Sequence, residues 1–147
     1  MRMKLLAALA VLALTGGIVA VISTPGGVKA TVYKSPECAC CGNYVGYLRR
    51  NGFDVRIEEV ADMTPIKRRF GVPQDLESCH TMDVGGYVVE GHVPIEAIDR
   101  LLSEKPGIKG IALPGRPEGS PGMPGPKSDK FIIHTISDTK STVFMVQ

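Results

Sequence analysis

Three of the four cysteines in this 147-residue chain, Cys38, Cys40 and Cys41, lie within four consecutive residues. The fourth, Cys79, is followed directly by His80. Thiolates are soft ligands that favour Cu(I), Zn(II) and iron–sulfur clusters. A Cys-x-x-Cys pair at the start of a helix is also typical of thiol–disulfide exchange. The sequence therefore indicates either a soft-metal site or a redox site, and the rest of the chain must bring Cys79 and His80 to the other three cysteines.

The spacing of the cysteines favours copper among the soft metals. Cys38 and Cys41 can point to one side of a helix, whereas Cys40 lies about 100° from Cys41 around the helix axis. Such a set suits a Cu(I) cluster with shared thiolates better than one tetrahedral metal ion. Met123 could add a thioether, and His80 could be a ligand or a hydrogen-bond donor to one. Zinc is the competing metal, because four Cys, or three Cys and a His, make a structural zinc site.

Two other interpretations of the cysteines compete with metal binding. In a periplasmic thiol–disulfide oxidoreductase, Cys38 is the attacking thiol and Cys41 the resolving one, although Cys79 facing that pair is unusual for such an enzyme. In a disulfide-stapled module, four cysteines allow three pairings, of which a bond between the neighbours Cys40 and Cys41 is strained. A chain of this length has core enough without staples. We expect a metal-binding protein, with the oxidoreductase as the alternative.

The first 30 residues have the pattern of an export signal. Arg2 and Lys4 precede a short apolar run, and small-residue cleavage sites follow Ala20 and Ala30. An uncleaved membrane anchor is the alternative, since the apolar run approaches the ~20 residues of a spanning helix. In either case we expect residues 31–147 to form one domain that is periplasmic or otherwise exported. Free thiols in an oxidising compartment must be metal-bound, paired or kept reduced by a partner.

The charge balance does not suggest a nucleic-acid partner. The formal net charge is +2, and residues 1–30 hold three basic and no acidic side chains, so the remainder carries −1. The basic run Lys67-Arg68-Arg69 is interpreted as a solvated helix face.

Hydrophobic periodicity predicts strands and helices in alternation, with strands over residues 31–34, 53–60 and 87–90 and helices over residues 36–51, 65–70 and 94–105. Thr64 is the predicted N-cap of the second helix. Ser35 as N-cap and Pro36 as first helical residue would place three cysteines in the first turns of the first helix, where the helix dipole favours thiolate. Residues 74–83, which contain Cys79 and His80, show no clear period and are predicted to form a loop.

The C-terminal part is predicted to add more strands. A short strand is expected over residues 108–113, and residues 131–134 and 142–146 read as a terminal hairpin. From Pro114 to Pro126, nine of thirteen residues are Gly or Pro, which predicts a stiff segment without regular structure. The order predicts an α/β fold, specifically a thioredoxin-like β-α-β-α-β-α sandwich with an extra C-terminal β-hairpin.

Four segments resemble the CopG-type proteins of copper-resistance systems, which are small periplasmic proteins long catalogued as a domain of unknown function: residues 35–41, 78–81, 86–94 and 119–123. The similarity covers roughly residues 32–123. Two positions depart from the family pattern, because Ala39 stands where Gly is frequent and Arg116 stands where Met is frequent.

This resemblance implies a thioredoxin-like fold and the handling of Cu(I) by the cysteines. The family's thiols match Cys38, Cys40, Cys41 and Cys79 in this sequence. Copper ions, and other copper-handling proteins that exchange them, are then the expected partners.

Overall fold

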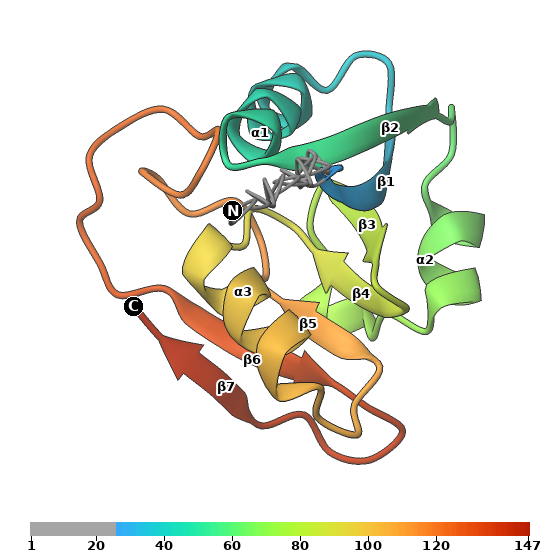
Figure 1. Cartoon of the computed structure of the whole chain (residues 1–147), viewed down its shortest axis with the longest axis vertical. Coiled ribbons are helices and arrows are strands. Elements are labelled where there is room, and N and C mark those ends of the chain that lie inside the picture. Colours follow the sequence, from blue (N-terminus) through green and yellow to red (C-terminus); the bar gives the residue numbers. More distant parts are fainter. Residues whose placement is uncertain (1–25) are drawn as a thin grey trace, which may run out of the picture.

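The computed structural model describes residues 26–147 (Figure 1). Most of the predicted signal segment, residues 1–25, therefore lies outside the described residues. The described part contains these elements in chain order: β1 (Val28–Lys34), α1 (Ala39–Arg50), β2 (Phe53–Glu59), α2 (Thr64–Phe70), a 3-10 helix (Gln74–Leu76), β3 (His80–Val84), β4 (Tyr87–Glu90), α3 (Ile95–Glu104), β5 (Gly110–Ala112), β6 (Ile132–Ile136) and β7 (Val143–Val146). The predicted mixed α/β class is confirmed.

The strands form one mixed sheet of seven strands in the described residues, in the order β2-β1-β3-β4-β5-β6-β7. β1 runs parallel to β2 and antiparallel to β3, so β1 is a central strand. β3 and β4 form a hairpin around Gly85 and Gly86, both of which have positive φ. The two C-terminal strands pair antiparallel with one another, and β6 also pairs with β5, so they extend the main sheet.

Two apolar clusters cover the two faces of the sheet. The larger joins α1 and α3 to the inward side chains of the strands, including Val32, Met82, Val89 and Ile111. The smaller lies on the other face, with Val72 and Leu76 next to α2 and with the strand residues Val88, Ala112 and Ile136. Figure 1 shows α2 set apart from α1 and α3. None of the helices in residues 26–147 has the length and apolar composition needed to cross a membrane.

The predicted loop over residues 74–83 is wrong, because its second half is the strand β3. The side chains of His80, Thr81, Met82 and Val84 are all buried, since this strand is covered on both faces. A strand buried on both faces lacks the polar–apolar alternation that marks a half-exposed strand. Cys79 is therefore the residue directly before a central strand.

Three smaller expectations also change. The first strand begins at Val28, three residues before the predicted start. The second helix has Met63 at its N-cap in place of the predicted Thr64. The basic run is not uniformly solvated, because Lys67 is buried while Arg68 and Arg69 are exposed.

Candidate metal centre

The first turn of α1 carries three of the four cysteines. The helix begins at Ala39 with Cys38 as its N-cap, so the prediction of Ser35 as cap was wrong. The reason is a tight turn in which the Cys38 N–H donates to the Ser35 carbonyl (3.1 Å), which delays the helix by three residues. Cys38 and Cys41 are joined by a disulfide, with their Cα atoms 5.3 Å apart.

The fourth cysteine meets this turn from the β3 side. The Cys40 sulfur lies 3.5 Å from the Cys38 sulfur and 3.9 Å from the Cys79 sulfur. The Cys41 sulfur is in turn 3.8 Å from the Cys79 carbonyl oxygen. All four sulfur atoms lie within 4.8 Å of one another. The structure thus brings together all four cysteines that the sequence singled out.

His92, which follows β4, also joins the site. Its Nδ1 is 2.7 Å from the Pro121 carbonyl oxygen, which can only accept, so Nδ1 carries the proton. Its Nε2 is then an unprotonated nitrogen, and it lies 3.0 Å from the Cys79 sulfur. A bare imidazole nitrogen beside a thiol can accept the S–H hydrogen bond or bind a metal ion.

The sequence held a signal that could have found His92. Two adjacent glycines between strands are typical of a two-residue hairpin. A hairpin centred on Gly85-Gly86 pairs Thr81 with Glu90, as observed. Continuing that register by two residues places Cys79 opposite His92. The prediction of a loop over residues 74–83 hides this register, because a loop has no strand pairing to continue.

His80 lies beneath the thiols on the α1 face of β3. Its Nδ1 is 3.5 Å from the Cys79 sulfur, and its Nε2 is buried without a hydrogen-bond partner in the described structure. The ring stacks at a tilt on Tyr44, whose ring centroid is 4.5 Å away. Tyr44 is itself buried and donates its hydroxyl to the Val93 carbonyl oxygen (2.8 Å), so it links α1 to the segment that carries His92.

Met123 shares a surface groove with Cys40. The groove has a volume of about 680 Å³ and is also lined by Asn43 and Arg50. The segment that carries Met123 is held against α1 by Gly122, whose carbonyl accepts from the Asn43 side chain (3.4 Å). The predicted thioether thus shares a groove with one of the four cysteines, Cys40.

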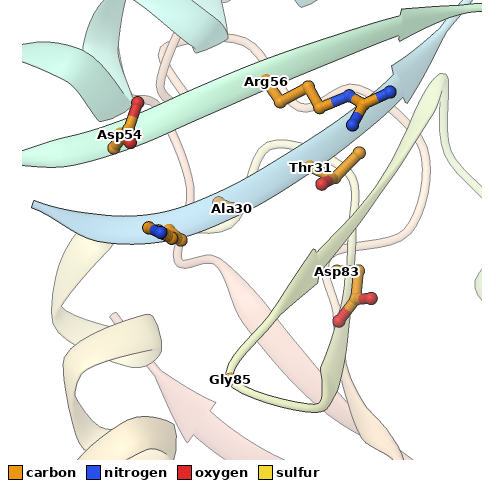
Figure 2. A pocket seen from close by; sticks show the side chains of 7 residues that line it. Ala30, Thr31, Asp54, Arg56, Asp83 and Gly85 are labelled. Carbon is orange, nitrogen blue, oxygen red and sulfur yellow. The ribbon is translucent and has the colours of Figure 1, made fainter.

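A second hollow of about 430 Å³ lies across β1, β2 and β3 (Figure 2). Its lining is a mixture of charges of both signs, from Lys29, Asp54, Arg56 and Asp83, and contains no cysteine or histidine. It therefore takes no part in the chemistry of the thiols.

Burial decides the protonation states at the site. The pKa of Cys79 is raised to about 12, chiefly by burial and to a smaller extent by the nearby Cys40 thiol. Cys79 is therefore a neutral thiol at pH 7. Burial lowers the pKa of His80 well below its usual value and also lowers the pKa of His92, so both imidazoles are neutral. A soft cation that binds Cys79 must therefore displace its proton, whereas the neutral imidazoles can bind without losing one.

Comparisons with known proteins identify the family. A family model described as protein of unknown function, DUF411, matches residues 76–123. Two solved structures, both named copper resistance protein copG (form 2 and form 1), are 36% and 35% identical to this chain, with TM-scores of 0.77 and 0.76. Each alignment covers 82% of this chain and 98% of the other. No curated protein sequence matches. The chain belongs to the CopG copper-resistance family.

Proposed function

We propose that this chain is an exported copper-binding protein of metal resistance or homeostasis, which binds Cu(I) through Cys38, Cys40, Cys41 and Cys79. The observation that carries the proposal is the convergence of four sulfur atoms within 4.8 Å from two separate elements. The copper-resistance proteins to which the chain is similar support copper as the metal. Met123, from the groove, and His80, beneath the thiols, are the auxiliary ligand candidates.

The chemistry of the donors supports Cu(I) over zinc. Cu(I) accepts few soft ligands, and thiolates shared between ions build clusters. Cys40 and Cys41 are adjacent in the chain, whereas structural zinc sites usually take their cysteines from separated knuckles. Zinc remains the competitor to be tested by direct competition.

Binding by all four sulfurs requires reduction of the Cys38–Cys41 disulfide. Two electrons and two protons convert that bond into two thiols, and a dithiol reductant supplies both. Cu(I) then displaces protons from the thiols. Other copper-handling proteins are the proposed source and acceptor of the metal.

We further propose a thioredoxin-like fold and export. The parallel β1-α1-β2 unit, the antiparallel β3-β4 hairpin and the following α3 support the fold assignment, with β5, β6 and β7 as additions to it. The basic and apolar pattern of the first 30 residues supports export to the periplasm, with the membrane contacted through that segment if it is not removed.

The deciding experiment counts copper and thiols on the same sample. The protein is reduced and loaded anaerobically with Cu(I), freed of excess metal, and assayed for copper per chain and for reactive thiols. We expect retained copper and four shielded thiols. The double variant C38S/C41S should lose copper binding, and an unchanged copper content in that variant would refute the assignment.

Wild-type protein with its disulfide intact is the matched control for that variant. Like C38S/C41S, it offers only Cys40 and Cys79 as thiols, but it keeps the native sequence. Adding zinc in excess to the reduced copper-loaded protein tests the competing metal, and we expect the copper to stay bound.

A thiol–disulfide oxidoreductase is the alternative, favoured by the Cys38–Cys41 disulfide at the start of a helix. It predicts turnover in an insulin-reduction assay that depends on Cys38 and is indifferent to metal. Turnover by metal-free protein together with no retained copper would replace the copper proposal with this one.

A further inference from the structure

A buried ion pair lies behind the thiol cluster, on the opposite face of the sheet. Glu90, at the end of β4, is 0% exposed, and Lys67, on α2, is 5% exposed. The Lys67 ammonium donates to Oε1 of Glu90. Neither side chain belongs to the proposed copper site.

The Glu90 carboxylate also holds the segment that carries Cys79. Its Oε1 accepts the backbone N–H of Ser78 (2.6 Å), and its Oε2 accepts the hydroxyl of Thr81 (2.6 Å). Ser78 and Thr81 directly flank Cys79 and His80. One carboxylate therefore fixes both ends of the four-residue segment.

Side chains alternate along β3, so residues 78–81 contact groups on both faces of the sheet. His80 faces α1 together with Met82 and Val84, which belong to the larger apolar cluster. Thr81 faces the α2 side, where it meets Glu90. The segment is tightly packed as well, since a Cβ on Gly91 would lie 2.6 Å from the Ser78 Cβ.

Stability alone does not account for this arrangement. Removing two charges from water costs so much that a buried ion pair is often no more stabilising than apolar side chains of similar size. A carboxylate with three donors does, however, define one geometry for the groups around it. A metal site needs its ligands held to within about 0.5 Å.

We propose that Glu90 and Lys67 are positioning residues for Cys79. Together they hold residues 78–81 in one conformation, which places the Cys79 sulfur next to the thiols of α1. Cys79 can then bind Cu(I) together with those thiols. The inference rests on the proposed function for its copper readout. The positioning itself is a property of the metal-free protein and is tested there separately.

The test compares the wild type with the double variant K67M/E90L. This variant replaces the ion pair with an apolar pair, so no buried charge is left unpaired, while the three hydrogen bonds of the carboxylate are lost. In the reduced, metal-free protein, we expect Cys79 to be alkylated by iodoacetamide at least tenfold faster than in the wild type. Cys40, on α1, should change less than twofold, as followed by mass spectrometry.

Copper affinity gives the second readout. We expect K67M/E90L to bind Cu(I) at least tenfold more weakly than the wild type in competition with a chelator. E90Q should fall between the two, because its amide oxygen can still accept hydrogen bonds. R68Q changes an exposed charge next to Lys67 on the same helix and should match the wild type in both readouts.

The outcomes separate the two proposals. A Cys79 alkylation rate within twofold of the wild type in folded K67M/E90L overturns the positioning role. Absence of copper binding by the wild type overturns the proposed function instead, and the alkylation rates still decide the role of Glu90 and Lys67. An equal acceleration of Cys40 and Cys79 would indicate general loosening and also overturn the proposal.

Discussion

Two regions supply the thiols, and they are held in different ways. Cys38, Cys40 and Cys41 occupy the first turn of one helix, so their separation follows from local backbone geometry. Cys79 depends on distant groups: its strand is paired on both sides, and its sulfur is 3.0 Å from His92. One half of this site, on α1, is therefore set by local sequence and the other half, at Cys79, by tertiary structure, so the two halves should respond differently to substitution.

Tyr44 links the two regions, and its removal should have the largest effect. Y44A deletes a fully buried ring that touches His80 and His92. We expect the free energy of unfolding to fall by about 3–5 kcal/mol, as for other buried aromatic residues replaced by Ala. Urea unfolding of the metal-free protein measures this.

Y44F is the control, because it keeps the ring and loses only the hydrogen bond to the Val93 carbonyl. We expect it to cost about 1 kcal/mol. If Y44A costs no more than Y44F, the ring does not join the two regions.

The pH dependence of copper affinity should distinguish the Cys79 side from the α1 side. Because the pKa of Cys79 is raised to about 12, copper must displace its proton throughout the neutral range. Each displaced proton makes affinity rise about tenfold per pH unit. Competition with a chelator between pH 6 and pH 8 should therefore show a slope that is lower by one proton in C79S. Equal slopes would mean that copper does not displace a proton from Cys79.

The same pKa shift has a consequence for folding. The thiol of the unfolded chain ionises near pH 9, whereas the folded thiol stays protonated until about pH 12. The folded state therefore binds more protons in that window, and stability should fall as pH rises from 9 to 12. C79S should flatten this part of the stability curve for the reduced protein.

The α1 half of the site could be predicted from the sequence more fully than the Cys79 half. The cysteine cluster of α1, most of the helices and strands, and the α/β class could be predicted from local patterns, because the apolar stripe of a helix depends on neighbouring residues. β3 was missed because burial on both faces removes its alternation. His92 and the Lys67–Glu90 pair were missed because strand register and a contact across 23 residues bring them to their places. Whether Met123 and His80 bind metal stays a prediction.

Gly122 lies between the two regions, and G122A should loosen their contact. Its φ of +85° lies in the left-handed range, and an added Cβ would lie 2.7 Å from the Tyr44 backbone nitrogen. We expect a loss of about 1–3 kcal/mol, the usual cost of such strain. Urea unfolding measures the loss, and ¹⁵N shifts of the His92 ring should report the weakened bond to Pro121. An unchanged stability would show that this segment is not held against α1.

A substitution at Gly42 tests the α1 half of the site and should have the smallest effect of all. It is exposed on α1 directly after Cys41, and an added Cβ would meet nothing within 4 Å. G42A should raise the free energy of unfolding by about 0.5–1 kcal/mol, because alanine costs less backbone entropy in a helix. Since the first turn already fixes the α1 thiols, a firmer helix should leave Cu(I) affinity within twofold of the wild type. A larger change in affinity would mean that α1 moves during binding, and the cysteines of α1 would then need tertiary support as Cys79 does.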